Sequence, residues 1–146
     1  MQGQLITDNK HLAQELFRKY NRKRLSPRCI MKIDLQKAFD SVHWDFLHEA
    51  LIGLNFPEQF IAWIMECVTT TSFSLAINGG TLGLFRGARG LRQGDPLSPY
   101  LFGICVEIFG RQIQQSTGRS GFSFHPQCAH LRLAHLAYAD DLLLFL

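Results

Sequence analysis

Two adjacent carboxylates, Asp140 and Asp141, stand between two strand-like segments near the C-terminus. Residues 131–136 alternate apolar and mixed side chains, and residues 142–146 are wholly apolar. Because Asp tolerates the backbone angles of tight turns, we predict a strand, a turn that carries both acids, and a second strand. An apolar strand of this kind needs neighbours on both faces. The rest of the sequence supplies few, so we expect the chain to be a fragment of a longer protein.

A third carboxylate, Asp34, ends the apolar run of residues 29–34, which we predict to be a buried strand. If that strand joins the same sheet as the C-terminal hairpin, the three acids converge. Hard oxygen ligands bind Mg²⁺ or Mn²⁺, and two such ions ~3.5 to 4 Å apart favour nucleotidyl transfer. Taken singly, each Asp is more often a turn former or a helix cap. The spacing alone therefore leaves both interpretations open.

The remaining segments indicate helices and one further hairpin. We predict helices at about residues 8–21, from Asp40 or Ser41 to about Gly53, from Pro57 onward, and from Ser98 to about Gln115. Residues 72–78 and 81–85 are expected to pair around an Asn-Gly-Gly turn, and a glycine-rich loop follows. Residues 116–127 are expected to form a loop with a short strand at residues 122–124. Trp44 and Trp63 lie on apolar helix faces and are expected in the core.

Charge and composition limit the class of protein. With 47% hydrophobic residues and 146 residues in all, the chain suits one globular domain or a piece of a larger one. No apolar run reaches the ~18 residues of a membrane helix, and the start of the chain carries no export signal. Four scattered cysteines favour an intracellular protein, in the nucleus or the cytoplasm. The net charge of +3 comes from a basic front that can bind nucleic acid or simply be a solvated helix face.

Three ordered segments closely resemble the A, B and C motifs of reverse transcriptases. They are residues 33–40 (Ile-Asp-Leu-Gln-Lys-Ala-Phe-Asp), 91–99 (Leu-Arg-Gln-Gly-Asp-Pro-Leu-Ser-Pro) and 138–141 (Tyr-Ala-Asp-Asp). The continuations Ser-Val-His-Trp-Asp-Phe-Leu after the first and Tyr-Leu-Phe after the second are similar to the non-LTR (LINE-type) retrotransposon branch. Group II intron maturases are the nearest cousin. The resemblance covers nearly the whole chain.

The resemblance implies an α+β fold, the palm of a right-hand polymerase, in which helices back an antiparallel sheet. Residues 1–28 would form a helix on the fingers side and a basic linker, and residues 29–146 the palm with motifs A, B and C. The fingers would be partial, and the thumb absent. Any endonuclease or RNase H domain would lie elsewhere in the parent protein.

The resemblance also implies a catalytic site. Asp34, Asp140 and Asp141 would hold two Mg²⁺ or Mn²⁺ ions, with Asp141 the less certain ligand, and Leu35 would add its backbone carbonyl. Phe39 would stand against the sugar and collide with a ribose 2′-hydroxyl, which favours deoxynucleotides by steric exclusion. Core packing is an equally good account of Phe39.

Other motif residues have implied roles on the nucleotide and on the primer. Gln93 and Gly94 match the loop at the nascent base pair, where an amide can donate and accept hydrogen bonds and glycine permits close approach. Tyr138 would neighbour the primer end, although core packing explains it as well. Asp95 is expected only to cap a turn, and the arginines at 86, 89 and 92 either contact phosphates or are solvated. His125, Cys128 and His130 are one ligand short of a structural zinc site.

The implied parent protein is an RNA-directed DNA polymerase that uses an RNA template, a DNA primer and deoxynucleoside triphosphates. It is not expected to bind a membrane. The isolated chain, separated from the missing fingers and thumb segments of its parent polyprotein, is expected to be inactive. Three alternatives stay open. They are a truncated noncatalytic remnant, a reverse transcriptase like that of group II intron maturases, and a nucleic-acid-binding module that acts only through the basic front.

Overall fold

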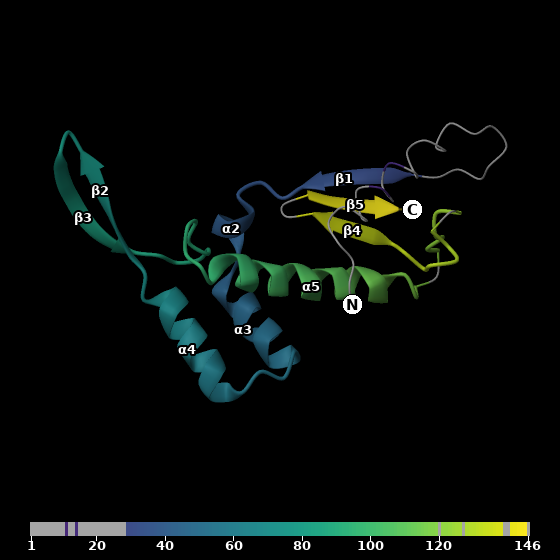
Figure 1. The fold of residues 1–146 in the computed structure, drawn as a ribbon, viewed down its shortest axis with the longest axis horizontal. Coiled ribbons are helices and arrows are strands. Elements are labelled where there is room, and N and C mark those ends of the chain that lie inside the picture. The colour runs from purple at the N-terminus through teal and green to yellow at the C-terminus, as the bar shows by residue number, and fades with distance from the viewer. Residues whose placement is uncertain are drawn as a thin grey trace. The chain divides into compact units, whose positions relative to one another are not determined.

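The computed structural model describes residues 29–119, 121–126, 128–138 and 141–145, together with His11 and Gln14. The chain divides into two compact units, one of residues 1–36 and 110–146 and the other of residues 37–109. Both units combine helices with antiparallel strands, which confirms the predicted α+β class (Figure 1). The helix predicted at residues 8–21 lies outside the described residues, apart from His11 and Gln14, which are helical.

The first unit is built on a three-stranded antiparallel sheet in the order β1-β5-β4, with β5 in the middle (Figure 1). The strands are β1 (Ile30–Asp34), β4 (His135–Tyr138) and β5 (Asp141–Phe145). Strand β1 joins the sheet of the C-terminal hairpin, as the convergence of the acids requires. The first hairpin strand begins at His135 rather than at residue 131, because residues 128–132 form turns in which Arg132 has a positive φ of 49°.

The core of the first unit lies under the middle strand. Its buried members are Cys128, Leu136, Leu143 and Phe145, and Ile30 and Leu133 pack partly buried against them. Leu142 is buried as well, so β5 is covered on both faces, as a central strand should be. The prediction that β1 is buried is wrong. Within the described sheet β1 is an edge strand, and its Met31 is 44% exposed.

The helices of the second unit follow the predicted order with one correction. They are α2 (Ala38–Ser41), α3 (Trp44–Gly53) and α4 (Glu58–Thr69). The prediction of one helix starting at Asp40 or Ser41 is wrong, because Val42 is extended (φ −62°, ψ 117°) and separates α2 from α3. The Ser41 hydroxyl donates to the Ala38 carbonyl and thus closes α2. The predicted end at Gly53 is confirmed, and the helix expected from Pro57 begins one residue later, at Glu58, with Pro57 as its N-cap.

Helices α3 and α4 pack against each other through aliphatic side chains. Leu47 and Leu51 of α3 and Ile61 and Ile64 of α4 are buried. The prediction that Trp63 lies in the core is wrong, because its side chain is 60% exposed. The apolar stripe that contains Ile61 and Ile64 faces inward and leaves position 63 on the outer side of α4.

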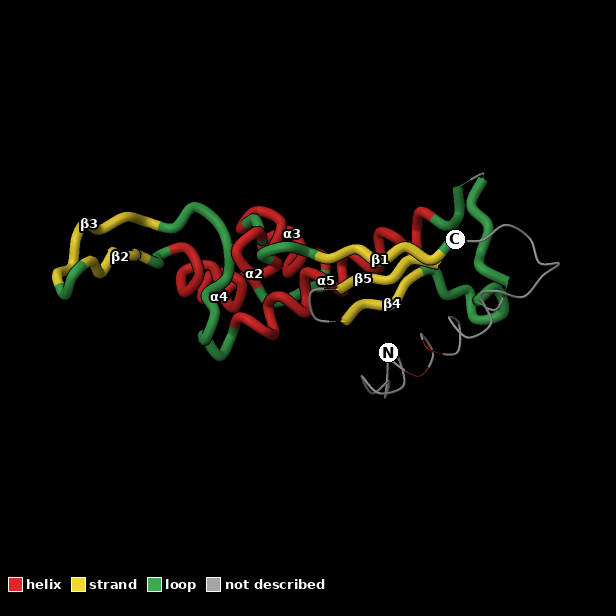
Figure 2. The backbone as a smooth tube through the Cα atoms, turned by 90° about the horizontal axis from the view of Figure 1, so that it is seen from above, coloured by secondary structure: helices red, strands yellow, loops and turns green. Residues whose placement is uncertain are grey.

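The predicted hairpin is present as β2 (Ser72–Ile77) and β3 (Gly80–Arg86) (Figure 2). Asn78 and Gly79 both have positive φ, 51° and 80°, which is the geometry of a type I′ turn between twisted strands. All residues of both strands are exposed.

The long helix α5 (Ser98–Ser116) begins and ends close to its predicted bounds. Residues 98–109 belong to the second unit and residues 110–116 to the first. The predicted strand at residues 122–124 is wrong, since those described residues are irregular and the Phe122 and Phe124 rings meet edge to face at 5.0 Å. None of the described helices is long and apolar enough to cross a membrane.

Candidate active site

Two of the three predicted catalytic carboxylates lie directly opposite each other in the first unit. The Cα atoms of Asp34, the last residue of β1, and Asp141, the first residue of β5, are register partners. Directly opposite side chains of an antiparallel pair project from the same face of the sheet. Asp34 is exposed and Asp141 is partly buried. The fold thus brings together acids that are distant in the sequence, at a sheet end that solvent reaches.

A lysine occupies the same face. The Lys32 ammonium lies 2.8 Å from Oδ2 of Asp141. Lys32 precedes Asp34 by two residues, and successive side chains of a strand alternate between faces, so both project from one side of β1. Lys32 was not among the predicted site residues. The signal was its two-residue spacing from Asp34 within a predicted strand.

The chemistry of this pair fits a divalent metal ion. Carboxylate oxygens are the hard ligands that Mg²⁺ and Mn²⁺ prefer, and no thiol or imidazole is needed. Asp140 lies outside the described residues, and the part of the chain that is described contains no cluster of three or more His, Cys, Asp or Glu side chains able to hold a metal. Leu35 is partly buried in the turn after β1, where the Gln36 amide donates to the Asp34 carbonyl.

Tyr138 is the last residue of β4. Its Cα is the register partner of Asp141 on the side of β5 opposite to β1. The backbones of Tyr138 and Asp34 therefore flank Asp141 on its two sides.

In the second unit, Phe39 packs against an aromatic neighbour. Its ring stacks on that of Phe102 in α5, with centroids 4.7 Å apart. The backbone carbonyl of Phe39 accepts a hydrogen bond of 2.8 Å from the amide of Leu91. Phe39 is partly buried, so one side of the ring is a packing surface and the residue is not wholly withdrawn from solvent.

The glycine loop after the hairpin is bound tightly to the α2–α3 segment. The Gly90 amide donates to the Val42 carbonyl, and the indole Nε1 of Trp44 donates to the Gly90 carbonyl at 2.9 Å. Gly90 has a φ of 93°, and a Cβ atom there would lie 2.9 Å from the Asp40 carbonyl oxygen. Glycine is therefore required at this position. Sequence reasoning missed the anchoring role of Trp44, because 46 residues separate it from Gly90 and no local pattern connects them.

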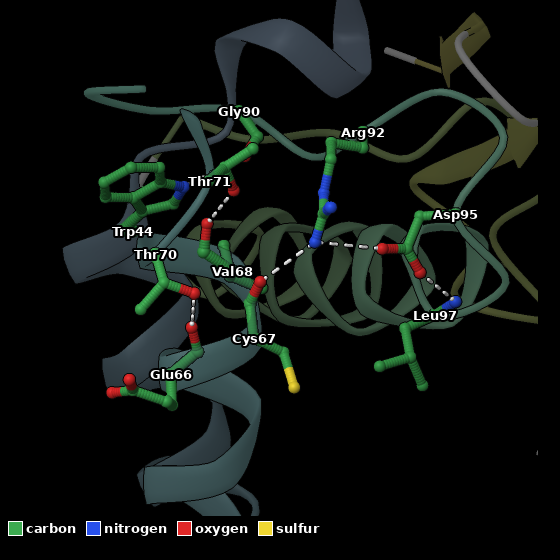
Figure 3. A network of polar contacts seen from close by, with 10 residues as sticks. All are labelled: Trp44, Glu66, Cys67, Val68, Thr70, Thr71, Gly90, Arg92, Asp95 and Leu97. Atoms are coloured by element: carbon green, nitrogen blue, oxygen red, sulfur yellow. Dashed lines mark hydrogen bonds and ion pairs between the residues drawn. The ribbon is translucent and has the colours of Figure 1, made fainter. Parts of the chain in front are cut away.

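Further along the loop, Arg92 and Asp95 form a polar network with α4 (Figure 3). Nη2 of Arg92 donates to the Cys67 carbonyl at 3.0 Å and lies 3.3 Å from Oδ2 of Asp95. The other carboxylate oxygen of Asp95 accepts a hydrogen bond from the Leu97 amide. Asp95 thus caps the turn around Pro96, as the sequence predicted, and Arg92 ties the loop to the end of α4.

An open cavity of about 550 Å³ lies beside this loop. The residues that line it include Trp44, Phe73, Arg89, Arg92 and Gln93. Gln93 and its neighbour Gly94 are exposed, and nothing lies within 4 Å of a Cβ atom built on Gly94. Aromatic faces combined with cationic groups are the chemistry that binds unpaired nucleic-acid strands.

The three residues of the partial zinc pattern, His125, Cys128 and His130, differ in their exposure to solvent. His125 and Cys128 are buried, with Sγ 3.9 Å from Nδ1, and burial raises the pKa of the Cys128 thiol. His130 is exposed. Cys128 belongs to the apolar core under β5, which accounts for its position in the fold.

Comparison with known proteins identifies relatives along nearly the whole chain. Residues 2–146 match the family described as "Reverse transcriptase (RNA-dependent DNA polymerase)". The chain is 31% identical over 115 residues to the Pol polyprotein of the type-1 retrotransposable element R2 of Popillia japonica, which is 79% of this chain and 18% of that protein.

Two other relatives match more of the chain. The Pol polyprotein of the type-2 retrotransposable element R2DM of Drosophila melanogaster is 29% identical over 131 residues, 90% of this chain and 12% of its own length. The transposon TX1 149 kDa protein of Xenopus laevis is 29% identical over 142 residues, 97% of this chain and 10% of its own. The chain thus spans between 10% and 18% of the length of these relatives.

Proposed function

Because this chain belongs to the reverse transcriptase (RNA-dependent DNA polymerase) family, we propose that it forms the palm and part of the fingers of an RNA-directed DNA polymerase of a non-LTR retrotransposon. In this proposal residues 29–146 are the palm and residues 1–28 lie on the fingers side. The antiparallel β1-β5-β4 sheet supports the assignment. The names of the relatives, which include the R2 elements, favour a retrotransposon over a group II intron maturase.

The substrates of the whole protein are an RNA template, a DNA primer and deoxynucleoside triphosphates. The primer 3′-hydroxyl attacks the α-phosphate, a new phosphodiester bond forms, and pyrophosphate leaves. Two bound Mg²⁺ or Mn²⁺ ions would supply activation of the hydroxyl and stabilisation of the leaving oxygen. Asp34, Asp140 and Asp141 are the side chains that would hold them, with the Leu35 carbonyl as an additional oxygen. The observation that carries this assignment is the direct pairing of Asp34 with Asp141 across two strands.

The other motif residues position the substrates. Phe39 would exclude the ribose 2′-hydroxyl, and its stack on Phe102 supports this role because it restricts the ring to one orientation. Gln93 and Gly94 would contact the nascent base pair, and the open space beside Gly94 is consistent with close approach of a nucleotide. Tyr138 would face the primer end. Arg89 and Trp44, in the wall of the cavity next to Gln93, would contact the nucleic-acid strand.

The test is primer extension on an RNA template by a full-length parent enzyme that contains this chain. Asp34→Asn and Asp140→Asn should each lower the extension rate by several orders of magnitude, because stabilisation of developing charge is the largest catalytic contribution. Glu49→Gln is the matched control, since it also neutralises one carboxylate, on an exposed position of α3. Extension by the Asp140→Asn enzyme at the rate of the Glu49→Gln enzyme would contradict the proposal.

Two measurements on the 146-residue chain test the noncatalytic alternatives. We expect no primer extension by the purified chain with Mg²⁺, and incorporation would contradict that expectation. A module that binds nucleic acid only through its basic front predicts affinity that falls with salt and does not change in Asp34→Asn or Asp141→Asn. A polymerase site predicts that divalent ions bind to the chain and that Asp34→Asn lowers the affinity for these ions.

A further inference from the structure

The ion pair of Lys32 with Asp141 occupies the candidate catalytic face rather than a remote surface. Lys32 Nζ is 2.8 Å from Asp141 Oδ2, and Asp141 is the direct cross-strand partner of Asp34. Lys32 is itself the cross-strand partner of Leu143. The ammonium therefore reaches diagonally along the face, toward the strand end where the two carboxylates stand.

This arrangement has an electrostatic reason. Like charges directly opposite each other in an antiparallel pair destabilise the pairing. Asp34 and Asp141 form such a pair, and a neighbouring cation relieves the repulsion between them. Lysine suits the task because its ammonium is a compact charge on a flexible stem, which can approach a carboxylate and also withdraw from it. The Lys32 side chain is 61% exposed, so solvent is available to it after withdrawal.

We propose that Lys32 is an internal counter-cation of the carboxylate site, which neutralises Asp141 when no divalent ion is bound and competes with that ion for Asp141. The inference rests on the ion site proposed above and adds a residue to it. Partly exposed ion pairs contribute little to folding stability. The main effect of Lys32 is therefore on divalent-ion affinity, which it lowers, so that the site exchanges its ions more readily.

The expected size of the effect follows from Coulomb's law. A unit charge about 6 Å from a divalent ion, in a medium close to water, changes the ion's affinity by roughly tenfold. Added monovalent salt screens the charge and should reduce the difference between the variants.

The experiment is a titration of the purified 146-residue chain with Mn²⁺ alone, followed by electron paramagnetic resonance of the free ion. Lys32→Gln and Lys32→Met, which keeps the aliphatic stem, should bind Mn²⁺ roughly tenfold more tightly than the natural chain. Lys32→Arg keeps the positive charge and therefore should not tighten Mn²⁺ binding. Arg119→Gln is the matched control, because it removes one positive charge from an exposed position of the same unit. It should leave the affinity unchanged.

The results separate the counter-cation role from the ion site itself. Asp34→Asn is measured alongside and should abolish the tight binding. If Asp34→Asn weakens Mn²⁺ binding but the two neutral Lys32 variants bind as the natural chain does, the role of Lys32 is wrong and the ion site stands. If no Mn²⁺ binding depends on Asp34 in any folded variant, the ion site is wrong, and the role of Lys32 is wrong with it. If Arg119→Gln raises the Mn²⁺ affinity as much as the Lys32 variants do, the effect comes from net charge alone, and the inference is wrong.

Discussion

Gly110 of α5 and the imidazole ring of His135 of β4 lie so close that a Cβ atom at position 110 would be 2.5 Å from Nε2 of His135. The absence of a side chain at Gly110 is what permits this contact. Strand β4 pairs with β5, whose first residue is Asp141. The contact is therefore part of the packing that supports the strand with the candidate metal ligand.

Gly110→Ala should destabilise the chain. The added methyl group overpacks the contact with His135 and should lower the free energy of unfolding by about 1–3 kcal/mol, measured by urea denaturation. Gly103→Ala is the control on the same helix, since nothing lies within 4 Å of a Cβ atom there. It should raise stability by about 0.5–1 kcal/mol through helix propensity. In a His135→Ala background the ring is gone, so Gly110→Ala should cost much less there. An equal loss in both backgrounds would show that the contact is not its cause.

The indole of Trp44 should contribute to stability through its hydrogen bond to the Gly90 carbonyl. Trp44→Phe keeps an aromatic ring but removes the donor, so we expect the free energy of unfolding to fall by about 1–2 kcal/mol. Trp63→Phe is the matched control, because Trp63 is 60% exposed and its change should stay within about 0.5 kcal/mol. Equal effects of the two substitutions in urea denaturation would contradict the anchoring role of Trp44.

The elements that the sequence predicted correctly are those fixed by local patterns. The Asn78-Gly79 turn requires two positive φ angles, which these residue types adopt readily, and the hairpin followed from it. The errors arose where distant contacts override local preference. Val42 is extended because its carbonyl accepts a hydrogen bond from the amide of Gly90, which lies in a loop far along the chain. That contact divides the predicted helix. Trp63 was assigned to the core by its apolar character, but the helix turns it outward.

The candidate site shows the same division. The motifs predicted that Asp34 and the acidic pair would meet if their strands shared a sheet, and the register supplies that pairing for Asp34 and Asp141. The period of two along β1 could also have placed Lys32 on the same face. The stack of Phe39 on Phe102 could not be predicted, because it depends on the approach of α5 to α2, and residues 63 positions apart carry no shared pattern.

Alkaline pH should destabilise the chain through a buried thiol. Burial raises the pKa of Cys105 from 9.0 to about 11, so the unfolded state releases this proton at a lower pH than the folded state does. The contribution is fully present below about pH 9 and is lost as the pH rises toward about 11. Cys105→Ala should therefore show a smaller fall in melting temperature over this range than the natural chain. Cys67→Ala, at an exposed thiol, should keep the natural slope, and identical slopes for all three proteins would contradict the assignment.

Phe39 should control the choice of sugar if its ring stands against the incoming nucleotide. In a full-length parent enzyme, Phe39→Val removes the ring and should raise the ratio of ribonucleotide to deoxynucleotide incorporation by roughly ten- to a hundredfold. Phe102→Leu removes the stacking partner but keeps the ring at position 39, so it should change the ratio less than Phe39→Val does. If Phe39 serves core packing alone, both substitutions will lower the melting temperature and neither will change the ratio. A folded Phe39→Val enzyme with the natural ratio would therefore remove Phe39 from the nucleotide site.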